Sequence, residues 1–167
     1  MGDLTKNFSV SEFEQSQVAS RHMIDNTILA AENPDWVYLC LSRTAYALQM
    51  LRDKVEVARR EARSVSILSG YRCIPLNRKI GSFNNSQHVM GEAADIRVQG
   101  MSAKEVFEFI YDDQDLRELF DQVILEFGSW VHISVCALPR KQYLIATRER
   151  RVIGPPKTVY TPYLNDF

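Results

Sequence analysis

Residues 86–96 read Ser-Gln-His-Val-Met-Gly-Glu-Ala-Ala-Asp-Ile, and this stretch says most about the fold. Its first residues are polar and typical of a loop, and small and apolar residues follow Gly91. The alternation over residues 93–98 predicts a strand. Asp95 lies inside that strand, between alanine and isoleucine. Burying a carboxylate there is costly unless a partner offsets the lost hydration, and a metal ion would do so.

Two histidines have settings that match the chemistry of Asp95. His88 ends the polar loop seven residues earlier, and His132 stands in a strand-like run, Trp-Val-His-Ile. Two imidazoles and one carboxylate form a zinc ligand set that leaves a fourth position free, as catalytic zinc sites do. Spacing alone also fits hydrogen-bonded structural histidines. The third histidine, His22, follows an arginine on a predicted helix and is interpreted as an ordinary helix residue.

The segments around this stretch predict an α+β fold. Capping boxes, in which serine precedes glutamate by three residues, start helices at Ser9 and Ser102. Apolar residues at three- and four-residue steps predict a long helix from Asn33 to near Arg63. Further strands are predicted at residues 65–68, 123–127, 130–135 and 143–146, the second and third forming a hairpin.

The length of 167 residues suits one domain with a real core. We expect a single domain over residues 1–167, with its core at about 26–150 and a small, mainly antiparallel sheet flanked by helices. From Gly154 onward Pro155, Pro156 and Pro162 predict an extended tail.

Composition narrows the class of protein and its partners. Apolar residues make up 46% and charged residues 25%, which is typical of a globular chain. The formal net charge of −1 disfavours nucleic acid as a partner, because proteins that bind a phosphate backbone usually carry a basic excess. Cys40, Cys73 and Cys136 are far apart and form no C-x-x-C pair, so they predict buried or half-buried thiols.

Membrane and export signals are not found in the sequence. No apolar run approaches the roughly 20 residues that span a bilayer, so no membrane partner is expected. The first residues lack the basic stretch and apolar run of a secretory signal. We therefore expect cytoplasmic synthesis, and we expect a monomer.

Three motifs accompany the stretch at residues 86–96: Ser-Gly-Tyr-Arg at 69–72, Asn77, and Trp-Val-His-Ile at 130–133. Together they resemble the zinc D-alanyl-D-alanine carboxypeptidase family, which includes many phage endolysin peptidases and shares the Hedgehog fold. The similarity covers about residues 26–134. It implies the Hedgehog/DD-peptidase fold and a metallopeptidase acting on peptidoglycan stem peptide or cross-link. It also implies one zinc ion per chain, held by His88, Asp95 and His132.

The resemblance gives roles to two more residues. Arg72 matches the arginine that contacts substrate near the scissile carbonyl, where a guanidinium stabilises negative charge or holds a carboxylate end. Its alternative is an ordinary surface arginine after a turn. Ser86 also matches the motif, either in orienting substrate or as a structural turn residue.

The catalytic base departs from the family's better-known pattern. Family members place a glutamate three residues before the third ligand or a histidine two before it, but here those positions hold Ser129 and Trp130. Glu126 is the nearest carboxylate and our candidate base, with Glu92 as second choice. A two-residue hairpin turn would place Glu126 and His132 on opposite faces, so this assignment requires a bulge, one extra residue in the hairpin.

Three functions follow from these expectations. The first is an active zinc peptidase of the cell wall; the absence of a leader then fits a phage lysin that acts after release by a holin. The second is a catalytically inactive, zinc-containing binding module for cell-wall peptide. The third is a metal-free structural or assembly protein of a phage particle.

Overall fold

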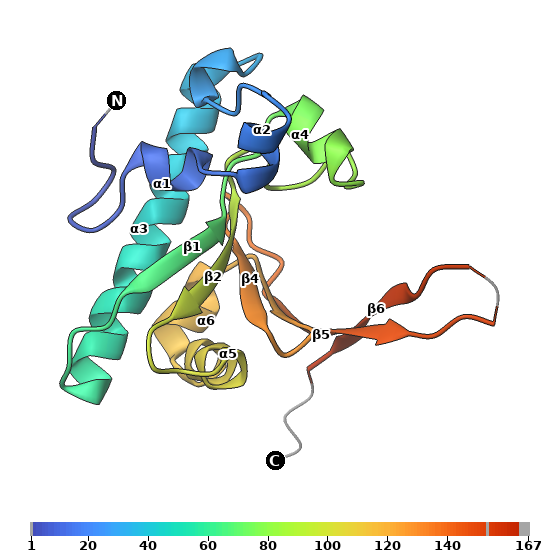
Figure 1. The fold of residues 1–167 in the computed structure, drawn as a ribbon. Helices are drawn as coiled ribbons and strands as arrows, with labels where there is room; N and C mark the ends of the chain where they lie inside the picture. Colours follow the sequence, from blue (N-terminus) through green and yellow to red (C-terminus); the bar gives the residue numbers. More distant parts are fainter. Residues whose placement is uncertain (1, 153, 164–167) are drawn as a thin grey trace.

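One six-stranded sheet runs through the molecule in the order β1-β2-β4-β3-β5-β6 (Figure 1). The computed structural model describes residues 2–152 and 154–163. Neighbouring strands are antiparallel except β3 and β5, which are parallel. The strands are β1 Val65–Ser69, β2 Ala93–Val98, β3 Gln122–Glu126, β4 Trp130–Ser134, β5 Gln142–Glu149 and β6 Lys157–Pro162. The predicted α+β fold with a mainly antiparallel sheet is confirmed.

Helices precede and interrupt the sheet along the chain. They are α1 Val10–Glu14, α2 Gln17–Arg21, the 3-10 turn η1 Ile28–Ala30, α3 Pro34–Arg59, α4 Ile74–Lys79, α5 Ala103–Asp112 and α6 Gln114–Leu119. Both predicted capping boxes are present, at Ser9 and Ser102. None of the helices within the described ranges is long and apolar enough to cross a membrane.

The long helix α3 starts where the sequence predicted and ends earlier. The Asn33 side chain accepts a hydrogen bond from the Trp36 amide and caps the first turn. The helix ends at Arg59 rather than near Arg63, because Arg60 takes a left-handed conformation with φ of 53°. That conformation stops the helix and lets Arg63 turn back to donate to the Gln99 carbonyl.

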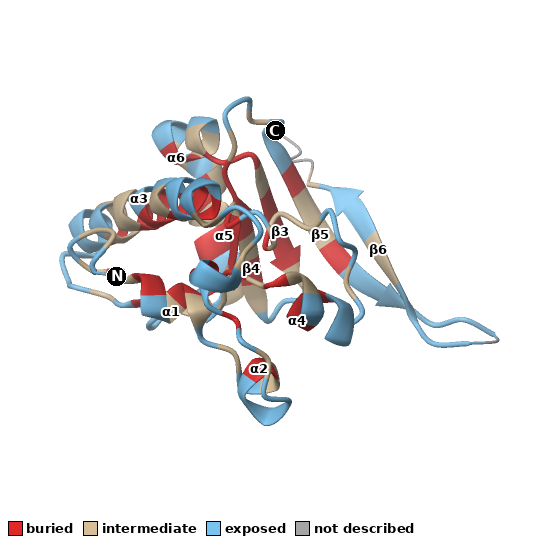
Figure 2. Ribbon diagram, turned by 90° about the horizontal axis from the view of Figure 1, so that it is seen from above, coloured by how far each residue is buried: buried red, intermediate tan, exposed pale blue. Residues whose placement is uncertain are grey.

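The two faces of the sheet have different surroundings. Side chains alternate along each strand, so Val123 and Leu125 of β3 point to one face with Val131 and Ile133 of β4. These residues belong to the buried core, which α3 and α5 cover from the same side (Figure 2). The intervening residues of β3 and β4 point to the other face, which the helices leave open to form a cleft.

The C-terminal segment is extended and also forms a paired strand, β6. β6 pairs antiparallel with β5 over six residue pairs, including Ala146 with Tyr160. The resulting hairpin projects from the body of the molecule (Figure 1). The prolines are compatible with this because Pro162 ends an edge strand, where its missing amide hydrogen costs no ladder bond. The expected extended tail is an edge strand as far as residue 162.

Candidate active site in the open cleft

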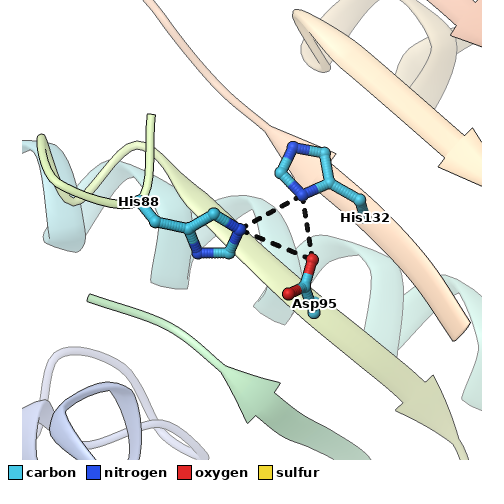
Figure 3. Close-up of side chains that lie close together, drawn as sticks. All are labelled: His88, Asp95 and His132. Atoms are coloured by element: carbon cyan, nitrogen blue, oxygen red, sulfur yellow. Dashed lines mark hydrogen bonds and ion pairs between the residues drawn. The ribbon is translucent and has the colours of Figure 1, made fainter. Parts of the chain in front are cut away.

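Strand pairing places Asp95 beside His132. The two residues are directly opposite in the ladder between β2 and β4, and both point into the cleft. Asp95 Oδ1 lies 2.9 Å from His132 Nδ1. His88, from the loop before β2, brings its Nε2 to 3.3 Å from His132 Nδ1 and 3.5 Å from Asp95 Oδ1 (Figure 3). The three residues that the sequence predicted as ligands therefore converge.

The Ser-Gly-Tyr-Arg motif holds His88 in place. His88 Nδ1 lies 2.7 Å from the Gly70 carbonyl oxygen, which can only accept, so Nδ1 carries the hydrogen and Nε2 keeps its lone pair for the cluster. The Arg72 amide donates to the His88 carbonyl at 3.1 Å. Gly70 has no room for a side chain, because a Cβ there would lie 2.7 Å from the backbone of Phe13.

Protonation states in the cluster favour metal binding. Burial lowers the pKa of His88, although Asp95 opposes the shift, and this favours the neutral imidazole. Burial alone would raise the pKa of Asp95, but His88 and His132 outweigh it and hold the pKa well below its usual range. A neutral imidazole and an ionised carboxylate are the forms that bind a divalent metal. The ligand atoms all lie within 4.8 Å of one another, so the cluster fits a metal ion.

Arg72 is bound to the cluster itself. Its Nη2 donates to Asp95 Oδ2 at 2.9 Å and its Nε to the Ser69 hydroxyl at 2.9 Å. The side chain is 13% exposed, so the alternative of an ordinary surface arginine is wrong. Because Arg72 occupies Oδ2, the other oxygen of Asp95 is the one directed at the histidines.

Glu126 and His132 point to the same face of the sheet, because the hairpin contains the extra residue that the sequence analysis required. Phe127 and Gly128 both have positive φ, and the Ser129 amide donates to the Glu126 carbonyl to close a tight turn. Glu126 nevertheless pairs with Trp130 rather than Ser129, and Ile124 pairs with His132. Ser129 is thus the additional residue. Glu126 consequently points into the cleft, one step of about 7 Å along the strand from the His132 pair.

The surroundings of Glu126 perturb its acidity. The side chain is half-buried, and this burial raises its pKa, with a further increase from Asp95. His132 and Arg72 lower the pKa but do not cancel the effect of burial. A carboxyl group whose pKa is raised and which lies beside a metal-ligand cluster has the character of an acid–base group.

The comparison with protein families matches residues 6–134 of the chain to Peptidase M15. The chain belongs to the peptidase M15 family. The match covers 86–96, the Ser-Gly-Tyr-Arg motif and the strand that carries His132, and it confirms the family resemblance of the sequence. Membership makes the protein a peptidase and hence a hydrolase. A search of curated proteins finds no match.

The other candidate site residues of this M15 peptidase lie in different parts of the structure. Ser86 lines the cleft, whose volume is about 820 Å³, in the turn that leads to His88. Glu92, the second-choice base, is not among the described residues that line this cleft. It faces α3 instead, where the Cys40 thiol lies 3.9 Å from its Oε1. His22 is exposed at the end of α2 and takes no part in the cluster.

Sequence reasoning gave no role to several polar residues of the cleft, among them Asp121, Arg140 and Tyr160. Asp121 is fully buried, and Arg140 and Tyr160 follow the part of the chain that matches the M15 family. Asp121 gave a usable signal, since like Asp95 it is an acid beside an apolar run at a strand start. Arg140 and Tyr160 gave none, because only the pairing of β5 with β3 and β6 brings their segments to the cleft.

Proposed function

We propose that this M15 peptidase is a zinc-dependent enzyme that hydrolyses peptide bonds of peptidoglycan, at a bond involving a D-residue. The observation that carries the proposal is the convergence of three metal-ligand atoms within 4.8 Å in an open cleft. The family supports peptide hydrolysis, and the donor set of two imidazoles and a carboxylate supports zinc.

His88, Asp95 and His132 would hold one zinc ion per chain. When bound, the ion would lower the pKa of water and polarise the substrate carbonyl. The protein's part is to fix the donors: Gly70 orients His88, and Arg72 orients Asp95. Such supporting contacts set the tautomer and the direction of each ligand.

Glu126 would act as the acid–base group of the reaction. Its carboxylate accepts the proton of the attacking water and later gives it to the nitrogen of the leaving amine. The raised pKa favours the first of these transfers, because a carboxylate of higher pKa is the stronger base toward the proton of water. The position of Glu126, one strand step from His132 on the same face, supports this role.

Arg72 and Ser86 would bind the substrate beside the cluster. The Arg72 guanidinium is fixed by Asp95 and Ser69, so it is preorganised to stabilise negative charge on the carbonyl oxygen or to hold a carboxylate end. Ser86, which lines the cleft in the turn before His88, would bind the substrate backbone. We further propose that the protein is a monomer made in the cytoplasm, which reaches the wall after release, as a holin-dependent phage lysin does.

Amine release from purified peptidoglycan tests the proposal, with wild type and Glu126→Gln compared at equal zinc content. We expect wild type to release new amino groups and the variant to release at least about 10²-fold fewer per unit time. Mass spectrometry of the products identifies the bond. Zinc retention without release by wild type would favour the inactive binding module instead. Absence of both zinc and release would favour the metal-free structural protein.

A further inference from the structure

A second charged cluster lies in the same cleft and is built around Asp121. This residue joins α6 to β3 and is 0% exposed. Its carboxylate accepts hydrogen bonds from Gln87 Nε2 at 2.9 Å, the Ser134 hydroxyl at 3.2 Å and the Arg140 amide at 2.7 Å. Arg140 also donates to it from Nε, at 3.0 Å, and from Nη2. Asp121 is therefore a fixed anchor for the Arg140 side chain.

The Nη1 group of the Arg140 guanidinium remains available in the cleft. Nε and Nη2 are engaged by Asp121, and Nη2 also donates to Gln87 Oε1 at 3.1 Å. Nη1 has no hydrogen-bond partner among the residues that the structure describes, and the side chain is 50% exposed. A half-exposed guanidinium that is fixed through Nε and Nη2 and has Nη1 unused is preorganised to donate a hydrogen bond to an anion.

Two of the residues that hold Asp121 stand close to metal-ligand residues along the chain. Gln87 immediately precedes His88, and Ser134 is two residues beyond His132 on the same face of β4. Two strand residues span about 7 Å. An extended peptide advances about 3.3–3.6 Å per residue, so a substrate along β4 would bring a group about two residues from the reacting bond to Arg140.

We propose that Arg140, held by Asp121 and Gln87, is a specificity subsite that binds a free carboxylate of the substrate about two residues from the bond cut. The reference to a bond cut rests on the proposed peptidase function. The ligand is a carboxylate because its ionised oxygen accepts a charge-assisted hydrogen bond from the free Nη1, whereas a neutral carboxamide loses the charge-assisted part of the interaction. The negative charge of Asp121 offsets the positive charge of Arg140. The preference for a carboxylate therefore comes from the direction of the Nη1 donor rather than from a net positive field.

Binding titrations with two synthetic stem peptides test this subsite. The peptides are identical except that the carboxyl group two residues from the D-residue bond is free in one and amidated in the other. We expect the free acid to bind zinc-loaded wild type about tenfold more tightly, the scale of a hydrogen bond to a charged group. Equal affinities for the two peptides, or no binding of either, would overturn the subsite.

Variants separate recognition by Arg140 from a merely structural ion pair. Arg140→Ala should bind both peptides equally, at the affinity of wild type for the amide. Because that change leaves Asp121 buried without its cation, the double variant Asp121→Asn/Arg140→Gln removes both charges and should give the same result. Arg150→Ala removes an arginine from an exposed position on the hairpin and should keep the tenfold preference.

Cleavage of the same peptides is measured in parallel. If the acid preference in binding is present but neither peptide is cut, the subsite stands and the proposed peptidase function fails. If both peptides are cut with equal kcat/KM and bound equally, the function stands and the subsite fails. A retained tenfold preference in folded Arg140→Ala would also overturn the assignment.

Discussion

The cleft contains two arginine–carboxylate pairs, Arg72 with Asp95 and Arg140 with Asp121, that differ in which atoms they leave without a protein partner. In the first, Arg72 is 13% exposed and holds only Oδ2 of Asp95, so Oδ1 is directed at two imidazoles. In the second, both oxygens of Asp121 receive donors from the protein, while the guanidinium of Arg140 is 50% exposed. The first pair leaves one carboxylate oxygen directed at the imidazoles, and the second leaves Nη1 of the arginine available.

This difference separates a cation site from an anion site. An ionised carboxylate with one oxygen directed at two imidazoles offers lone pairs to a metal. A carboxylate whose oxygens are already satisfied offers nothing to a cation, but it fixes its arginine for an anion. The two pairs thus give the cleft opposite preferences about two strand residues apart.

The largest effect is expected from removing the imidazole of His88, which lies beside the Arg72–Asp95 pair. His88→Ala should lose most of the bound zinc, because two protein ligands hold the ion far more weakly than three. Plasma emission on dialysed protein measures the zinc content. Asp121→Asn is the matched control and should keep about one zinc per chain. Full zinc retention by His88→Ala would remove that residue from the site and break the contrast between the two clusters.

Glu126→Gln is expected to give the next largest effect. The amide is isosteric and Glu126 is not one of the three ligands, so fold and zinc content should be preserved. Turnover on cell-wall peptide should fall by about 10²–10⁴-fold, the range for loss of an acid–base group. Glu92→Gln is the control, because Glu92 faces α3 outside the cleft lining. Wild-type turnover by Glu126→Gln together with loss in Glu92→Gln would reverse the assignment.

Arg72→Ala tests whether the first pair serves the metal as well as the substrate. We expect turnover to fall by about 10²-fold, as for removal of one charge-stabilising donor. Because Arg72 also orients Asp95, zinc affinity should fall by about 10–100-fold. Competition with a zinc chelator of known affinity gives this number. Arg140→Ala should leave zinc affinity unchanged, and equal zinc losses in both variants would contradict the distinction between the pairs.

The smallest predicted effect concerns the stability that the second pair contributes. Burial tends to raise the pKa of Asp121, but its hydrogen bonds with Arg140 and Gln87 hold the pKa below its usual range. The carboxylate therefore stabilises the fold above about pH 4, and this contribution is lost as the pH falls through the lowered pKa. Asp121→Asn should cost about 1–3 kcal/mol at pH 7. Urea unfolding should show this difference shrinking as the pH falls below about 4, and a constant difference would contradict it.

The surroundings of the Arg72–Asp95 pair could be predicted from the sequence because the patterns that mark them are local. The strand at residues 93–98 was predicted with its observed bounds, and Asp95 within it was recognised as a buried acid that needs a partner. The hairpin of β3 and β4 was also expected, and the geometry demanded by Glu126 and His132 predicted its extra residue. Local patterning and a specific motif sufficed there.

The second pair could not be predicted because its partners meet only through long-range pairing. Arg140 lies 19 residues beyond Asp121, and no periodicity or motif links the two. Pairing of β6 with β5 was missed for the same reason, since the prolines after Gly154 indicate extended backbone but not its partner. The end of α3 was misplaced because the left-handed conformation of Arg60 has no signal in an arginine-rich stretch.

Zinc titration of peptidoglycan hydrolysis tests the central claim most directly. Metal-free protein is prepared with a chelator and supplied with increasing zinc, and release of amino groups from purified peptidoglycan is followed at each step. A zinc peptidase built on His88, Asp95 and His132 predicts no release without metal and a rate that rises to a plateau at about one zinc per chain. Undiminished release by the metal-free protein, or no release at any zinc level, would contradict the account.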